Sequence, residues 1–107
     1  MDKIRRMNQM YDLLISEVPA CPGKGNLTNF KSILEEEVEE IDDIMMIDER
    51  VDRIVAFADL LADVVVYCKS EALKFGIPFD EVFGIVMESN FSKLGEDGLP
   101  IKDERGK

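Results

Sequence analysis

The sequence predicts an all-α protein, and three observations support this class. Hydrophobic residues recur every three or four positions through most of the chain. Prolines and glycines gather between residues 19 and 26 and again at Gly76 and Pro78, which divides the chain into helix-length segments. No segment shows the pattern of a central strand. We therefore expect one domain covering residues 1–107, built as an antiparallel helical bundle.

The first helix is predicted over residues 2–18. Ile4, Met7 and Leu14 follow helical spacing there, with charged residues between them, so the helix is amphipathic. The segment 19–26, PACPGKGN, is too rich in proline and glycine to continue it. A loop is therefore expected before the second helix.

The second helix is predicted to begin after Asn26 or Thr28, because either side chain can cap the free amides of a first turn. It should run to about Met46. Its glutamates, within residues 35–40, lie partly beside the apolar line and partly opposite it. That apolar line consists of Phe30, Ile33, Leu34, Val38, Ile41, Ile44 and Met45.

The third helix is predicted over residues 49–75, with Asp48 as its cap and a length of about 40 Å. Gly76 suits the left-handed residue that follows a helix, and Pro78 prevents continuation. A fourth helix is predicted over residues 79–92.

The C-terminal tail begins at about residue 94 and contains few apolar residues. Its Asp97-Gly98 pair is a turn signal, which predicts a short turn, a small hairpin or a mobile end.

Composition excludes several classes of function. Thirteen basic against 23 acidic residues give a net charge of −10, so nucleic acid is not an expected partner. No apolar run reaches the roughly 18 to 20 residues of a membrane span, and no signal peptide is evident, so we expect a cytoplasmic protein without a membrane contact. Cys21 and Cys68 lack CxxC spacing. The sequence has no histidine, so catalysis would depend on carboxylates, lysines and amides.

The most unusual stretch is residues 54–67, IVAFADLLADVVVY, which is apolar except for Asp59 and Asp63. A spacing of four places both carboxylates on one face of a helix, one turn apart. Since the surrounding residues are apolar, both carboxylates are expected to be buried, and a buried carboxylate is costly without a positive partner. The sequence therefore predicts a cation at this position.

A second acidic cluster lies upstream, where Glu36, Glu37 and Glu40 share a helical face. We expect the two clusters to face each other across a helix pair and hold a divalent metal. Five oxygen ligands without nitrogen or sulfur favour Mg²⁺ or Mn²⁺ over zinc. Neither an EF-hand loop nor the Glu-x-x-His pairs of a di-iron bundle are present.

Two simpler readings remain open for these acidic residues. Acidic runs on helices are usually solvated faces, and this applies to residues 35–40 taken alone. Asp59 and Asp63 could instead form a buried salt bridge. The basic residues available for it are Arg50, Arg53 and Lys69. They lie six or more positions from either aspartate along the helix and would have to arrive from another helix or chain.

Four segments together resemble one known family. Residues 36–40, EEVEE, fit the EExxE signature of the MazG-like, all-α nucleoside triphosphate pyrophosphohydrolases, which include the phosphoribosyl-ATP pyrophosphohydrolases. Residues 58–63, ADLLAD, then 75–80, FGIPFD, and 88–94, ESNFSKL, are similar to the family's second acidic motif, helix break and SNxSK segment, in the same order and spacing. The resemblance covers roughly residues 7–107.

The chain also departs from the family pattern. The second motif of the family is ExxD, but Leu60 stands three positions before Asp63, and Asp59 is the expected replacement for the missing glutamate. Ser70-Glu71 replaces a small Gly-Thr pair, and phosphate contacts from the basic extension that follows the tail in relatives are not expected.

The resemblance implies a fold completed by dimerisation, as a homodimer or a dimer of dimers. It also implies Mg²⁺-dependent hydrolysis of nucleoside triphosphates, with deoxynucleoside triphosphates expected, between the α and β phosphates to a monophosphate and pyrophosphate. Asn90 would contact the base or sugar and Lys93 a phosphate. Without the resemblance, these two are an ordinary helix-terminal amide and a surface lysine. The residues it implies as metal ligands and catalytic groups are Glu36, Glu37, Glu40, Asp59 and Asp63.

Two alternatives belong to other functional classes. A helical dimer of the same fold could bind nucleotide, or regulate, without cutting it. A non-catalytic interaction module would keep the apolar third helix but tolerate loss of any one carboxylate. Stabilisation by Mg²⁺ separates a metal site from such a module, because a ligand that binds only the folded state raises its stability.

Overall fold

The computed structural model describes residues 2–92 and 98, and within these residues it contains helices and no strand. The all-α prediction is therefore confirmed for the described part of the chain. The chain divides into two compact units, and among the described residues the first holds three helices and the second holds one. In chain order the helices are α1 (Asp2–Met10), α2 (Lys24–Met45), α3 (Arg50–Lys74) and α4 (Phe79–Phe91).

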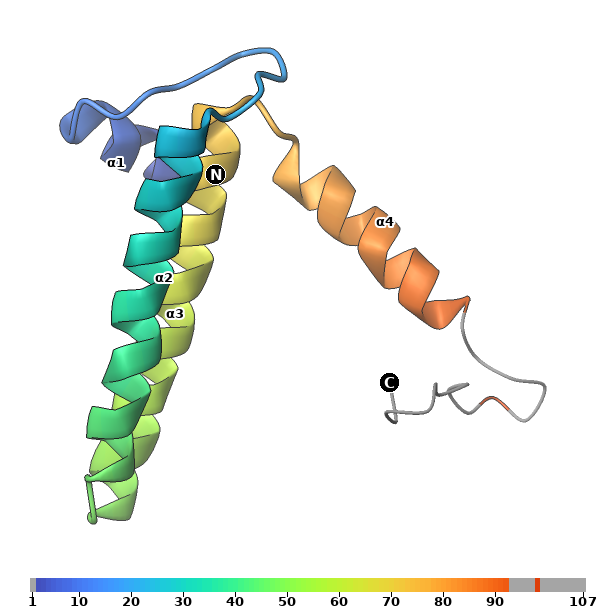
Figure 1. The fold of residues 1–107 in the computed structure, drawn as a ribbon. Helices are drawn as coiled ribbons and strands as arrows, with labels where there is room; N and C mark the ends of the chain where they lie inside the picture. Colours follow the sequence, from blue (N-terminus) through green and yellow to red (C-terminus); the bar gives the residue numbers. More distant parts are fainter. Residues whose placement is uncertain (1, 93–97, 99–107) are drawn as a thin grey trace. The chain divides into compact units, whose positions relative to one another are not determined.

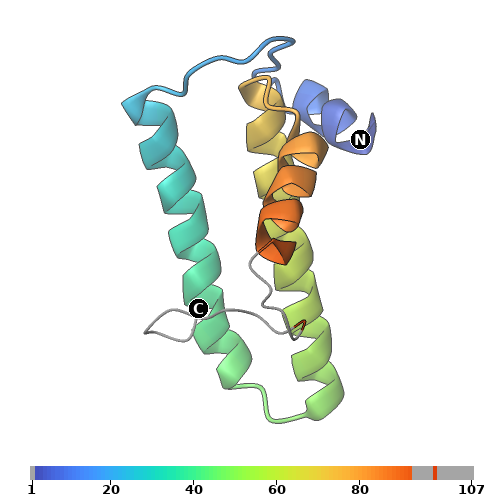
Figure 2. The same ribbon diagram turned by 90° about the vertical axis from the view of Figure 1, so that its right-hand side faces the viewer.

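The first unit is organised around an antiparallel pair formed by α2 and α3 (Figures 1 and 2). These helices contain 22 and 25 residues and are joined by a short connection over residues 46–49. The shorter α1 contacts α3 at the end of the pair where α2 begins and α3 ends (Figure 1). The two predicted acidic segments therefore lie on neighbouring helices.

The start of α2 differs from the prediction. The helix begins at Lys24 and its N-cap is Gly23, so neither Asn26 nor Thr28 caps the first turn as expected. The Asn26 side chain instead accepts a hydrogen bond from the Gly23 amide at 2.9 Å, and the Thr28 hydroxyl donates to the Lys24 carbonyl at 2.8 Å. Both polar side chains lie inside the first two turns, where they bond to the backbone behind them.

The start of α3 is one residue away from the predicted cap. Glu49, and not Asp48, is the N-cap, and its carboxylate accepts a hydrogen bond from the Asp52 amide at 2.7 Å. Hydrogen bonds from the backbone of Asp52 and Val51 lower the pKa of Glu49. A charged cap at this end also interacts favourably with the helix dipole.

The end of α3 follows the sequence prediction. Gly76 has a φ of +64°, the left-handed conformation that residues with a Cβ rarely adopt. The Ile77 amide donates to the Ala72 carbonyl at 2.8 Å, and the Gly76 amide donates to the Leu73 carbonyl at 3.4 Å. This pair of bonds is the Schellman motif that glycine permits at a helix C-terminus.

The first helix is shorter than predicted, because α1 ends at Met10 and not near residue 18. Asp12 has a φ of +54°, which turns the chain out of the helix. The amide of Ser16 then donates to the Leu73 carbonyl at 3.0 Å, and its hydroxyl donates to the Lys74 carbonyl at 2.7 Å. The segment 13–23 therefore runs past the end of α3 and supplies partners for carbonyls that a helix terminus leaves free.

A buried polar pair fixes α1 to α3. Asn8 is fully buried and Ser70 is 4% exposed. The Ser70 hydroxyl donates to the Asn8 side-chain oxygen at 2.7 Å, and the Asn8 amide group donates to the Ser70 carbonyl at 3.3 Å. Because each side chain is satisfied by the other residue, this contact holds α1 in one position on α3.

The apolar residues of α3 are less buried than the sequence indicated. Among the described residues, the buried apolar side chains are Leu60, Ala72, Leu73 and Phe75. Phe57, Leu61 and Val65 are about half exposed in the single chain. In this unit α2 and α1 therefore cover only part of the surface of so long a helix.

In the second unit, α4 agrees with the predicted segment to within one residue, and its side chains are largely exposed. The rings of Phe79 and Phe83, one turn apart, stack with their centroids 6.4 Å apart. The predicted tail from residue 94 lies outside the described residues except for Gly98, whose φ is +78°. No helix in the described part of the chain is long and apolar enough to cross a membrane.

Candidate metal centre

The centre of the candidate site is Glu37, a buried carboxylate on α2. The residue is 6% exposed, and one of its carboxylate oxygens, Oε2, is buried without a hydrogen-bond partner among the described residues. Burial raises the pKa of Glu37, and the charges of Glu40, Asp63 and Glu36 raise it further. An unpaired buried carboxylate is unfavourable, so a positive charge close to Glu37 would stabilise this arrangement.

The charges that act on Glu37 come from both helices. Glu36 and Glu40 are exposed residues of α2, whereas Asp63 is a partly buried residue of α3. The pairing of α2 with α3 therefore brings the two acidic segments of the sequence together at Glu37. Four of the five predicted ligands interact here: Glu36, Glu37, Glu40 and Asp63.

Asp59 does not share this environment. It lies one turn before Asp63 on α3 but is exposed, and its charge is not among those that raise the pKa of Glu37. The expectation that Asp59 is buried among apolar neighbours is therefore wrong for the single chain. Its neighbours Ala58 and Leu61 are exposed as well, so the apolar sequence around Asp59 does not remove it from solvent.

Within the described residues, basic side chains do not neutralise this cluster. The ion pairs found there join Arg5 to Glu17, Lys31 to Glu35, and Lys74 to Glu71. None of them involves a predicted ligand. The alternative of a buried salt bridge from Arg50, Arg53 or Lys69 is therefore not observed in the described part of the single chain.

The carboxylates share one region but do not converge on a point. Among residues 2–92 and 98, no group of three or more acidic, histidine or cysteine side chains has the arrangement that holds a metal ion. Of the predicted ligands, Glu37 fits a cation most clearly, because its buried oxygen has no other partner.

The two predicted substrate contacts lie away from this helix pair in sequence. Asn90 is an exposed residue near the end of α4, in the second unit. Lys93 lies outside the described residues. Their proposed roles as base, sugar or phosphate contacts stay predictions.

Tyr67 is a member of this region that the sequence analysis did not single out. It is half-buried on α3, one turn after Asp63. Burial raises the pKa of Tyr67, and the charges of Glu37, Asp63, Glu40 and Glu36 add to this effect. Its spacing of four from Asp63 was the available signal, but an aromatic residue in an apolar helix also fits a core position.

The α2–α3 pair has an apolar face on the side opposite the acidic residues. Glu37 on α2 and Leu60 on α3 are buried and mark the contact between the two helices. Successive residues of a helix are rotated by about 100°, so the residue after each of them lies on one side of the contact and the residue before it lies on the other. Because the helices are antiparallel, residues at the same rotation from Glu37 on α2 and from Leu60 on α3 lie on the same side of the pair. We define the apolar face as the exposed side chains of Val38, Ile41, Met45, Ile54, Phe57 and Leu61, which are 40–67% exposed.

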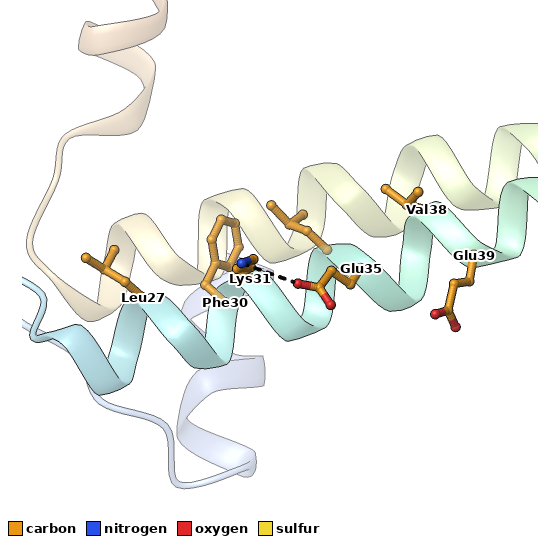
Figure 3. A pocket seen from close by; sticks show the side chains of 7 residues that line it. Leu27, Phe30, Lys31, Glu35, Val38 and Glu39 are labelled. Carbon is orange, nitrogen blue, oxygen red and sulfur yellow. Dashed lines mark ion pairs between the residues drawn. The ribbon is translucent and has the colours of Figure 1, made fainter.

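A shallow groove of about 430 Å³ extends the apolar face along α2 (Figure 3). Leu27, Phe30 and Val38 contribute apolar side chains, and the 3.9 Å ion pair between Lys31 and Glu35 lies beside them. The groove is on the apolar side of α2, so it is separate from Glu37 and its acidic neighbours. The remaining lining residues are Leu34 and Glu39.

Comparisons with known proteins do not assign a family. No protein-family model matches the chain, and no curated protein matches it. The features that bear on function are therefore the carboxylate cluster, the apolar face and the sequence motifs.

Proposed function

We propose that the protein is a Mg²⁺-dependent nucleoside triphosphate pyrophosphohydrolase. The proposed reaction cleaves the bond between the α and β phosphates and releases a nucleoside monophosphate and pyrophosphate. The supporting observation is Glu37, whose buried carboxylate has one unpartnered oxygen and three acidic neighbours on two helices. The resemblance of four sequence segments to the MazG-like enzymes supplies the reaction class.

The proposed site uses carboxylates in two ways. Glu37, Asp63 and their acidic neighbours would hold Mg²⁺ or Mn²⁺, because hard divalent cations prefer oxygen ligands. Such an ion would supply positive charge that offsets the carboxylates and the phosphates and would polarise phosphorus. A glutamate that is not engaged with the cation would accept a proton from the attacking water. In this proposal Glu36 and Glu40 are the exposed glutamates available for that role, and Asp59 is a ligand that must turn towards the cluster.

We also propose that the apolar face is covered by a second copy of the chain, in a homodimer or a dimer of dimers. The face combines six large apolar side chains that are 40–67% exposed, and it continues into the groove on α2. A contiguous apolar surface of this kind is unusual on a monomer. Since the face lies on the side of the helix pair opposite Glu36, Glu40 and Asp63, association through it would leave the acidic side of each copy accessible to substrate.

The rival function is a dimer that binds nucleotide without hydrolysing it. The exposed position of Asp59 is compatible with this rival, because the described carboxylates do not yet surround a single point. Binding assays alone do not separate the two functions. Product formation does.

The experiment is a panel of ribonucleoside and deoxynucleoside triphosphates incubated with the full chain and Mg²⁺. We expect equal amounts of monophosphate and pyrophosphate from at least one nucleotide, and loss of both products in chelator. Glu37→Gln is the test variant and Glu39→Gln the control, since Glu39 is an exposed glutamate of the same helix. Mg²⁺-dependent nucleotide binding without products supports the rival and contradicts the proposed hydrolysis.

A further inference from the structure

We draw no further inference here: the strongest candidate, the exposed apolar stripe of α4 formed by Val82, Phe83 and Val86, carries nothing because nothing in the described part of the structure shows what covers it.

Discussion

The carboxyl group of Glu37 on α2 lies close enough to that of Asp63 on α3 for the Asp63 charge to raise the pKa of Glu37. This relationship connects two acidic segments that are separated in sequence. It also identifies an energetic cost, because like charges on paired helices oppose folding until a cation neutralises them.

Replacement of Asp63 by asparagine should abolish turnover and raise stability in chelator by up to about 1 kcal/mol, because a repulsive charge is removed. A salt-bridge role for Asp63 predicts the opposite, a loss of about 3–5 kcal/mol with a buried partner left unpaired. Urea unfolding of both proteins in chelator distinguishes these cases. Strong destabilisation of Asp63→Asn would contradict the metal interpretation of this residue.

The metal-free protein should lose stability as pH rises because of Glu37. Its pKa is raised in the folded state above the usual value of 4.5 for a glutamate, so the folded protein retains this proton to a higher pH than the unfolded chain. The favourable contribution of Glu37 to the free energy of unfolding is complete below pH 4.5 and is lost as pH rises through the pKa of the folded state. In chelator, Glu37→Gln should lose less unfolding free energy than the wild type over this pH range.

The measurement is urea unfolding at a series of pH values, with Glu39→Gln as the control. Glu39 is an exposed glutamate of the same helix, so its replacement tests for a general effect of charge removal. A pH dependence of Glu37→Gln equal to that of the wild type would show that Glu37 does not carry this effect.

Gly76 should be intolerant of alanine. The residue has a φ of +64°, and an added Cβ would collide with the backbone carbonyl of Val18. We expect Gly76→Ala to lower the free energy of unfolding by about 2 kcal/mol or more. Gly84→Ala is the control, since a Cβ at this position of α4 meets open space and alanine should stabilise the helix by about 0.5–1 kcal/mol. Similar stabilities of the two variants would contradict the described end of α3.

A lysine at Leu61 should disrupt self-association. Leu61 is 50% exposed on the apolar face, and a charge there would be costly to bury against a second copy. Sedimentation should show a dimer or larger assembly for the wild type and a smaller species for Leu61→Lys. Asp43→Lys, at an exposed position on the other side of α2, should sediment like the wild type. A stable folded wild-type monomer at micromolar concentration would remove the proposed interface.

Local sequence signals predicted α3 and α4 closely, because both helices are bounded by features that act within a few residues. Gly76 ends α3 through its own backbone conformation, and α4 begins directly after Pro78. The end of α1 was predicted wrongly for a different reason. Residues beyond Met10 fit a helix by spacing, but Ser16 bonds to carbonyls of α3, a tertiary contact that periodicity cannot reveal.

The candidate site was predictable to a similar degree. Spacing placed Glu37 and Asp63 on faces that meet, but it did not determine the exposure of Asp59. The exposure of Asp59 depends on which segments pack against its side of α3. The apolar residues around Asp59 indicated that this side is buried, but in the single chain Asp59 is exposed. Tyr67 was overlooked because its ring fits a core position, whereas its significance comes from the charges around it.

The proposed reaction is hydrolysis of a nucleoside triphosphate by water at a carboxylate-held Mg²⁺ site. Its most direct test is hydrolysis in ¹⁸O-labelled water with Mg²⁺, followed by mass analysis of the separated products. We expect one labelled oxygen per turnover, carried by the monophosphate or by pyrophosphate, no release of orthophosphate, and no turnover in chelator. Stepwise release of orthophosphate, or turnover unaffected by chelator, would contradict the account.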